Sequence, residues 1–389
     1  MAERTKARHD ADELVYLPLG GAGEIGMNVY LYGCGPEQRR QWLMVDLGIT
    51  FPEGEFDPGV DVILPDLRFI EEERQNLLGI VLTHAHEDHF GAVLDLWPRL
   101  KVPVYATPFT VGLLKAKMAE NGVRLPIPIH KLPIGGRVTL GPFEIELVTM
   151  AHSIPEPNAL AIRTPHGMVL HTGDWKIDAT PVTGPPTDSA RLDALGRAGI
   201  DVLVCDSTNA MREGISPSER EVASTLAKLV REAPRRVAIT TFASNVGRVL
   251  AVAEAARAAG RRLVIAGRAM HRIIEVAKET GYLPRSLEVL DQREFEYQAA
   301  HEVVALCTGS QGESRAAMAR IAEGTHPDIA LGKDDLVIFS SRTIPGNEKS
   351  VGRIQNLLTR RGCRVLTDTD GLVHVTGHPR RAHERVGVR

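Results

Sequence analysis

The chain has 389 residues, of which 43% are hydrophobic and 24% charged, and its formal net charge is -3 with a pI near 6.5. This composition is typical of a globular protein with two domains, and it excludes a chain that needs disulfides to fold. Because no global basic signature exists, a nucleic-acid partner would have to be held by a local basic groove.

The N-terminal residues 1–13 are charged, without the apolar segment of a secretion signal, and no segment approaches the ~18 consecutive apolar residues of a membrane span. We therefore expect a disordered tail, a cytoplasmic protein and no membrane partner. The cysteines lack CxxC spacing, which favours buried free thiols in a reducing compartment. They are Cys34, Cys205, Cys307 and Cys363.

The first half of the chain alternates short β-rich segments with turns. It predicts a sheet with helices outside, and its last two strands form a hairpin around the turn 165–167. The predicted strands are 13–21, 28–34, 41–48, 79–84, 139–150, 159–164 and 168–173.

From Ser216 the pattern changes to a strict alternation of helices and apolar strands, which predicts a second α/β domain with a parallel sheet. Its first helix is predicted to begin with Ser216 as N-cap, Pro217 in the first helical position and Glu219 completing a capping box. The predicted strands are 236–242, 261–267, 301–309 and 335–341, and the helices between them are 245–260, 269–280 and 312–324.

The densest polar motif, HAHEDH at residues 84–89, directly follows the apolar strand 79–83. The carboxyl end of a strand is where α/β proteins usually present functional groups. His84 and His86 can face one ion, whereas Asp88 and His89 open a helix and can turn toward a second. Imidazole and carboxylate ligands suit Zn, Mn or Fe, and the absence of thiolates argues against a closed structural zinc site. The alternative is a solvated polar loop.

Two further residues lie at comparable ends of strands: His152 and Asp174. Each alone would be unremarkable, because a strand-end histidine is commonly a surface residue and aspartate after glycine is a common turn. Together with HAHEDH they offer a third ligand for one ion and a carboxylate able to bridge two.

These motifs resemble those of the metallo-β-lactamase superfamily, with Asp46 matching its early strand-end aspartate. Over residues 14–378 the chain is more specifically similar to the ribonuclease J family, in which a β-CASP domain is inserted into the lactamase fold. The motifs that support this similarity are LPLGGAGEIGMNVYLY, GDWKID, CDSTNA, TFASNVGR, CTGSQGE, SSRTIPGNE and HVTGH.

The resemblance implies an α/β protein with a four-layer αββα sandwich and an inserted β-CASP α/β domain. After the tail, the first part of the sandwich would span 14–210, the β-CASP domain 211–340 and the return segment 341–389. Relatives in the family continue past HVTGH to a PVHGE-like motif and a C-terminal domain, so the resemblance implies a truncated chain. Impaired activity is then expected, and a homo-oligomer is possible but disfavoured without that domain.

The resemblance also implies roles for individual residues. His84, His86 and His152 would hold one divalent ion, Asp88 and His89 the other, and Asp174 would bridge them; zinc is expected, with manganese as the alternative. Asp88, Asp206 and His378 would be catalytic, with Asp206 supporting His378 as the acid that protonates the leaving oxygen. The bridged ions would supply a hydroxide and hold the phosphate. Without the resemblance, a capping role for Asp206 and a simple turn at HVTGH would be favoured.

The implied substrate is single-stranded RNA with a 5'-monophosphate, cut from its 5' end, internally or both, in a cleft between the domains. Candidate substrate-binding residues are Ser244, Asn245, Ser341, His374, Val375, Thr376, Gly377 and His378. Arg248, Arg342 and the turn 309–312 are weaker candidates.

Simpler roles compete with these assignments. For Ser244 and Asn245 ordinary N-capping is at least equally plausible, and the basic run 359–364 is better explained as a solvated helix face. Competing functions are a small-molecule metallo-hydrolase, which would not need the second domain, and an RNA-binding chain that has lost activity.

Overall fold

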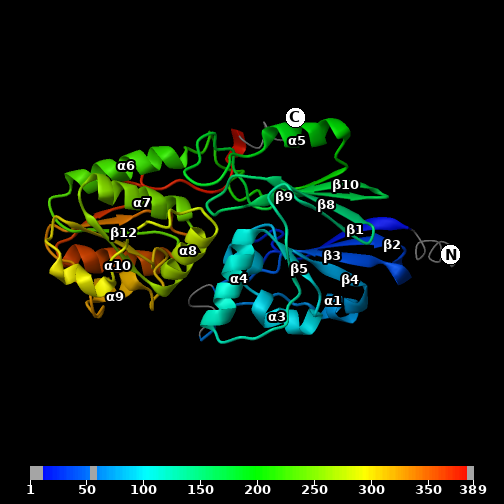
Figure 1. Ribbon diagram of the computed structural model, residues 1–389, viewed down its shortest axis with the longest axis horizontal. Coiled ribbons are helices and arrows are strands. Elements are labelled where there is room, and N and C mark those ends of the chain that lie inside the picture. Colours follow the sequence, from blue (N-terminus) through cyan, green and yellow to red (C-terminus); the bar gives the residue numbers. More distant parts are fainter. Residues whose placement is uncertain (1–11, 53–58, 383–389) are drawn as a thin grey trace. The chain divides into compact units, whose positions relative to one another are not determined.

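The computed structural model describes residues 12–52 and 59–382, so almost all of the predicted N-terminal tail lies outside the described residues. The chain divides into two compact units (Figure 1). The first comprises 1–177, 185–215 and 378–389, and the second comprises 178–184 and 216–377. The second unit is thus inserted into the sequence of the first, as the αββα and β-CASP architecture requires.

The first unit contains a six-stranded and a five-stranded sheet. The strands of the six-stranded sheet, in pairing order, are β1 (Glu13–Gly20), β2 (Val29–Gly35), β3 (Gln41–Val45), β4 (Leu77–Val81), β5 (Val104–Ala106) and β6 (Ile129–Lys131). The strands of the five-stranded sheet are β11 (Val202–Val204), β10 (Gly167–His171), β9 (Asn158–Thr164), β8 (Phe143–Thr149) and β7 (Arg137–Leu140). The predicted hairpin is confirmed, because β9 and β10 pair antiparallel.

The two sheets pack face to face and helices cover their outer sides, which gives the expected four layers (Figure 1). The helices of this unit are α1 (Arg68–Glu72), α2 (Glu87–Phe90), α3 (Val93–Leu100), α4 (Pro108–Glu120) and α5 (Ser189–Ala198), with short 3-10 turns η2 (Glu37–Arg39) and η4 (Arg74–Asn76).

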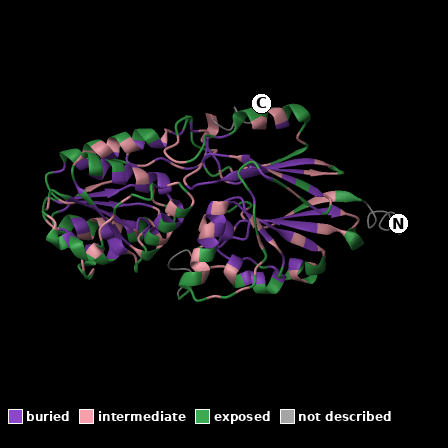
Figure 2. Ribbon diagram, viewed as in Figure 1, coloured by how far each residue is buried: buried purple, intermediate pink, exposed green. Residues whose placement is uncertain are grey.

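Successive side chains of a strand point to opposite faces of its sheet, so one strand contributes to both core layers of this unit. In β9, Leu160 and Ile162 point between the sheets, whereas Ala159 and Ala161 point toward the layer that contains Leu195 of α5. Both sets are buried, so the run of residues 159–162 is apolar at every position, and β9 is mostly purple in Figure 2.

The second unit is a five-stranded parallel sheet covered on both faces. Its strands, in pairing order, are β13 (Arg262–Ala266), β14 (Val303–Cys307), β12 (Val237–Thr240), β15 (Leu336–Phe339) and β16 (Arg364–Leu366). Its helices are α6 (Glu219–Glu232), α7 (Val246–Ala258), α8 (Arg268–Glu279), α9 (Ala317–Glu323) and α10 (Glu348–Arg360), together with the 3-10 turn η5 (Gln292–Tyr297). Within this unit, α6 and α7 lie over one face and α9 and α10 over the other (Figure 1).

The predicted return to the first domain at residue 341 is wrong. β16 pairs with β15 as the fifth strand of the second sheet, and α10 packs against that sheet through Val351, Ile354 and Leu358. The chain therefore re-enters the first unit only at His378.

The predicted cap of α6 is also wrong. Ser218 is the N-cap: its hydroxyl accepts from the Arg220 backbone, and Glu221 completes the capping box. Glu219 instead forms an ion pair with Arg248, with Oε2 and Nη2 2.9 Å apart. Ser216 with Glu219 and Ser218 with Glu221 both match the Ser-x-x-Glu pattern of a capping box, so contacts distant in sequence select between them.

The four cysteines are free thiols, three of them buried, as predicted. In the described part of the chain, no helix has both the length and the apolar character that crossing a membrane requires.

Candidate metal centre

The HAHEDH segment forms the loop after β4 and helix α2, and it is held against the loop that follows β3. Backbone bonds join Leu47 N to His89 O at 2.7 Å and Ile49 N to Glu87 O at 3.1 Å. Between them, a Cβ on Gly48 would lie 1.7 Å from the Asp88 carbonyl oxygen, so only glycine permits this approach. The loop that presents the metal-ligand candidates is therefore fixed by its neighbour.

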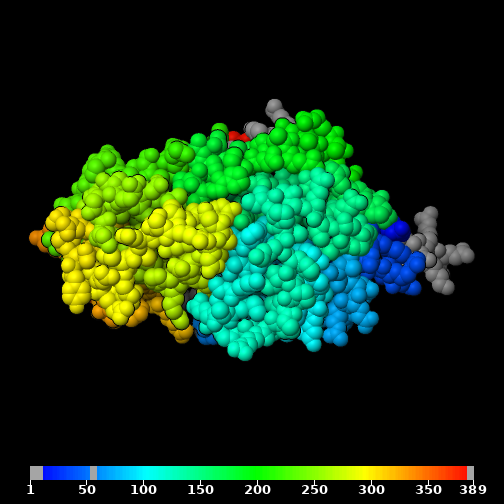
Figure 3. Space-filling model, in the orientation of Figure 1, coloured from blue at the N-terminus to red at the C-terminus, as the bar shows by residue number. Residues whose placement is uncertain are grey.

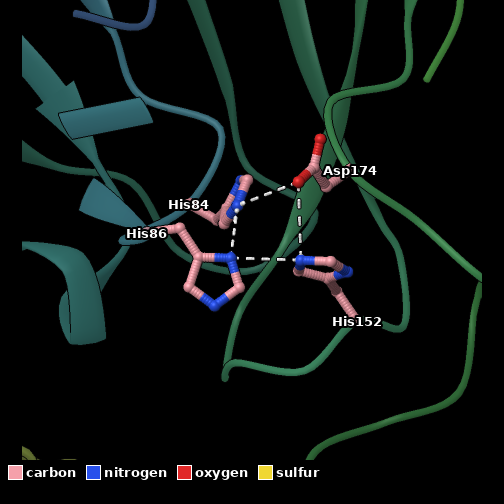
Figure 4. A group of neighbouring side chains, drawn as sticks. All are labelled: His84, His86, His152 and Asp174. Atoms are coloured by element: carbon pink, nitrogen blue, oxygen red, sulfur yellow. Dashed lines mark hydrogen bonds and ion pairs between the residues drawn. The ribbon is translucent and has the colours of Figure 1, made fainter. Parts of the chain in front are cut away.

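His84, His86, His152 and Asp174 form the first cluster (Figure 4). His86 Nδ1 lies 3.1 Å from both His84 Nε2 and His152 Nε2. Asp174 Oδ2 lies 3.8 Å from His84 Nε2 and 3.6 Å from His152 Nε2. Ligands of a tetrahedral ion at 2.0–2.1 Å are roughly 3.3 Å apart, so these spacings suit one small ion.

Asp88, His89 and Asp174 form a second cluster next to the first. His89 Nε2 lies 3.6 Å from Asp88 Oδ2 and 3.4 Å from Asp174 Oδ1. Asp174 therefore offers Oδ2 to one cluster and Oδ1 to the other, which is the arrangement of a carboxylate that can bridge two ions.

Hydrogen bonds to the far ring nitrogens orient two of these histidines. Asp46 Oδ2 accepts from His89 Nδ1 at 2.7 Å and from the Thr83 hydroxyl at 2.8 Å. Because the hydroxyl hydrogen already donates to Asp46, the Thr83 oxygen accepts a hydrogen bond from His84 Nδ1 at 3.0 Å. These hydrogen bonds orient both rings so that each Nε2 faces the clusters.

Asn28 and Thr83 are site residues that the sequence analysis missed. The Asn28 side-chain amide lies 3.0 Å from His89 Nε2 and donates to the Asp88 carbonyl, also at 3.0 Å. The available signal was a polar side chain at the head of the otherwise apolar strand β2. Thr83 gave a weaker signal, since it ends an apolar strand immediately before His84.

The electrostatics of the clusters follow from burial and from their own carboxylates. Burial lowers the pKa of His84 and of His86 well below the usual value, which keeps both imidazoles neutral as metal binding requires. Burial also lowers the pKa of His89, but Asp174, Asp88 and Asp46 outweigh it and raise that pKa well above its usual value. The second cluster therefore has an excess of negative charge, which a divalent cation would neutralise.

Asp206 and His378 lie beside the clusters, in the first unit. His378 Nδ1 is 2.7 Å from Asp206 Oδ2 and 3.9 Å from Asp174 Oδ2. Burial lowers the pKa of His378, but the carboxylates of Asp174 and Asp206 raise it to a net value of about 9. The predicted pairing across 172 residues is thus present, and it leaves His378 Nε2 directed away from the carboxylate that holds Nδ1.

The candidate substrate motifs of the second unit meet at the carboxyl edge of its sheet. Thr240 of β12 pairs with Phe339 of β15, so the segments that follow both strands emerge together. The Ser340 hydroxyl donates to the Val373 carbonyl at 2.6 Å, which places the start of the 373–377 loop at the same edge. The Gln311 amide in the 309–312 turn donates to the Arg342 carbonyl at 2.9 Å.

Two of the candidate substrate residues have structural roles. Asn245 caps α7, because its side-chain oxygen accepts from the Arg248 backbone at 2.9 Å. Arg248 is fully buried, so the expectation that it contacts RNA is wrong. Its guanidinium instead binds Glu219, Ser340 and the Val373 carbonyl, which ties α6, α7, β15 and the 373–377 loop together.

The fold and the histidine–aspartate clusters define a metal-dependent hydrolase of the metallo-β-lactamase type. The profile described as "Metallo-beta-lactamase superfamily" matches residues 23–231, and the profile described as "Ribonuclease J, beta-CASP domain" matches residues 234–358. The chain therefore belongs to the ribonuclease J family, whose members are metal-dependent ribonucleases, within that superfamily.

Curated relatives agree with this membership. The chain is 54% identical over 382 residues to a ribonuclease J of Sinorhizobium meliloti. This match covers 97% of this chain and 68% of that relative. It is 44% identical to a ribonuclease J of Mycolicibacterium smegmatis, covering 92% of this chain and 64% of that relative. It is 37% identical to a ribonuclease J of Helicobacter pylori, and the match covers 96% of this chain and 53% of that relative. The chain thus spans about half to two thirds of the length of these relatives.

A solved structure shares the fold. A crystal structure of a protein of unknown function from Enterococcus faecalis matches with a TM-score of 0.61 and 15% identity, covering 94% of this chain and 89% of that one. At this identity the likeness concerns the fold alone.

Proposed function

We propose that this chain hydrolyses phosphodiester bonds of single-stranded RNA at the centre formed by the two clusters, with two divalent ions, zinc or manganese, as cofactors. The observation that supports this most directly is the His378–Asp206 pair, 2.7 Å apart and adjacent to the shared carboxylate of Asp174. A small-molecule hydrolase would need the clusters. It would not need an acid from a segment that follows an inserted domain in the sequence.

Each group of side chains then has one task. His84, His86 and His152 would hold one ion, and Asp88 with His89 the other, with Asp174 shared between them. When bound, the ions supply a nucleophile at neutral pH and offset the charge that builds on phosphate. Asp46, Thr83 and Asn28 keep the ligand nitrogens in place through the hydrogen bonds described above.

His378 would protonate the departing ribose oxygen. Its raised pKa keeps it in the acid form at neutral pH, and Asp206 fixes the ring by accepting from Nδ1. A positioned acid typically contributes about 10²- to 10⁴-fold to the rate.

Replacing His378 with alanine should lower RNA cleavage by roughly 10²- to 10⁴-fold. The variant should nevertheless hydrolyse bis(p-nitrophenyl) phosphate at near the parental rate, because a nitrophenolate leaves without a proton. The two rates should be measured side by side, with metal content determined on the same samples.

His301→Ala is the matched control, since His301 is an exposed histidine of the second unit that contacts its sequence neighbour Glu302 at 3.7 Å. If His378→Ala lost equal activity on both substrates with its metal intact, His378 would not be the acid. If the parent chain cleaved neither substrate with zinc or manganese present, the proposed function itself would fail.

The preference for a 5'-monophosphate would arise at the carboxyl edge of the second sheet. Ser341 is buried, and among the described residues its hydroxyl has no hydrogen-bond partner. Buried hydroxyls without partners are rare in proteins, and a terminal phosphate would provide one. Ser244, with Asn245 beside it, and the loop of His374, Val375, Thr376 and Gly377 would complete this pocket.

Ser341→Ala should therefore weaken binding of 5'-monophosphorylated RNA by on the order of tenfold, the value of one hydrogen bond to a charged group, and leave 5'-hydroxyl RNA unaffected. Affinities should be measured in EDTA, where no cleavage occurs, with exposed Ser224→Ala as the control. Equal losses for both RNAs would argue against a terminal-phosphate pocket.

A further inference from the structure

The second unit contains a cavity of about 640 Å³ that the metal centre does not use. It opens at the carboxyl ends of β13 and β14, since Gly267 and Thr308 directly follow these paired strands and both line it. A volume of this size is typical of a small-ligand site. The remaining lining residues come from α8, η5, α9 and the segments beside α9.

The lining is strongly cationic for a chain whose net charge is -3. It contains four arginines, Arg268, Arg293, Arg315 and Arg320, and a single carboxylate, Asp291. Arg293 already pairs with Asp291, with Nε and Oδ1 2.8 Å apart. Three guanidinium groups are therefore left without an opposing charge inside the cavity.

Those three guanidinium groups lack a carboxylate partner anywhere in the part of the chain that the structure describes. Neither Arg268 nor Arg315 has a hydrogen bond or ion pair there, and Arg320 reaches only the Thr325 carbonyl at 3.5 Å. All three are exposed, whereas Arg353, also exposed, pairs with Glu323. Like charges gathered without compensation are unfavourable unless an anion binds between them.

The His326 ring and the first turn of α8 add uncharged N–H donors to the lining of the cavity. His326 Nδ1 accepts from the backbone of Asp328 and of Ile329, both at 3.2 Å, so its proton is on Nε2. Gly267 begins α8 with no side-chain cap, and a Cβ there would lie 2.3 Å from the Thr308 hydroxyl. Glycine therefore lets the first turn of α8 lie directly beside Thr308.

The chemistry of the lining selects the kind of anion. Planar guanidinium groups match phosphate oxygens in pairs, which makes arginine the usual residue for phosphate recognition. No Phe, Tyr or Trp lines the cavity, and Ala317 is the only aliphatic side chain in its lining, so it offers no apolar anchor for a peptide. The expected ligand is recognised through its phosphates and independently of sequence.

We propose that this arginine cavity binds backbone phosphates of an RNA strand, as a site separate from the metal centre and from the Ser341 pocket. The proposal rests on the ribonuclease function proposed above, because it names RNA as the source of the phosphates. Arg268, Arg315 and Arg320 are exposed, so a long strand can reach them. In Figure 3 the part of the second unit near residue 300, coloured yellow, lies at the surface.

The test measures binding of a 12-nucleotide single-stranded RNA to the full chain in EDTA, so that no cleavage occurs. The double variant Arg268→Ala/Arg315→Ala should raise Kd by tenfold or more. It should also reduce the slope of log K against log salt concentration by about 1.4 in magnitude, since each phosphate contact to a single strand contributes roughly 0.7 to that slope.

Arg231→Ala/Arg257→Ala is the matched control, because it removes the same charge from the same unit. Both residues are exposed in the last turns of α6 and α7, which run back to the amino edge of the sheet, opposite the cavity. The control should change Kd less than twofold. Thermal melting of all forms should coincide, since each replaced side chain is exposed.

Equal Kd values for the two double variants, with the parent still cleaving RNA, would overturn the cavity assignment and leave the proposed function standing. If adenosine 5'-monophosphate bound as tightly as the 12-mer and lost the same affinity in Arg268→Ala/Arg315→Ala, the cavity would be a free-nucleotide site and the RNA assignment would be wrong. A parent chain that neither bound nor cleaved RNA would overturn both proposals.

Discussion

Replacing Asp174 with asparagine should remove most of the bound transition metal and abolish RNA cleavage, whereas replacing His84 with alanine should mainly empty one site. The difference follows from geometry, because Asp174 belongs to both ligand clusters and to the group formed with Asp206 and His378. Loss of one ligand should weaken a site by at least tenfold, since even residues that only orient ligands contribute about 10- to 100-fold. Metal content by mass spectrometry and cleavage rates at increasing zinc or manganese would measure both effects.

His166→Ala is the control for these variants, as His166 lies in the β9–β10 turn of the same unit and contacts Asp12 at 2.9 Å. Its metal content should equal that of the parent. Unchanged metal content in both His84→Ala and Asp174→Asn would rule out the assignment of the metal centre.

Arg248→Met should destabilise the second unit by roughly 3–5 kcal/mol, the usual cost of leaving a buried charge without its partner. Arg248 is completely buried, and its Nη2 lies 2.9 Å from Oε2 of Glu219, which is also buried. Removing the guanidinium would take this ion pair from the buried Glu219 carboxylate and would leave the Ser340 and Val373 carbonyls without the hydrogen bonds that they accept from Arg248.

Comparison with Arg248→Met/Glu219→Leu separates the charge effect from the packing effect. This double variant should recover much of the lost stability, because no isolated charge remains in the interior. Urea denaturation followed by probes of the second unit would measure the difference. A double variant less stable than Arg248→Met would contradict this account of the pair.

The candidate metal ligands were predictable because each of their motifs follows an apolar strand, and strand ends are where α/β folds collect polar side chains. His84, His86, Asp88, His89, His152 and Asp174 all lie in the two clusters. Their supporting residues were harder to predict. Asn28 is 60 residues from Asp88 in sequence, and nothing in its local pattern distinguishes a ligand-orienting amide from a turn residue.

The fold predictions that failed were decided by contacts distant in sequence. Ser216 and Ser218 both precede a glutamate by three positions. Contacts distant in sequence favour Ser218 as the cap: its hydroxyl donates to Asp178, and Glu219 pairs with Arg248, 29 residues away. Likewise, the strand 364–366 has an ordinary β pattern that does not indicate which sheet it joins. Burial of Arg248 could not be inferred either, because an arginine early in a helix is usually solvated.

The order of the site along the chain has a consequence for synthesis on the ribosome. The metal ligands extend from residue 84 to residue 174 and Asp206 follows soon after, but His378 is added only after the entire inserted unit. Because domains fold as units during synthesis, beginning from the N-terminus, the nascent chain can assemble its metal clusters while the acid is still untranslated. With His378 as the acid proposed above, the growing chain would cleave RNA roughly 10²- to 10⁴-fold more slowly until the inserted unit has been made.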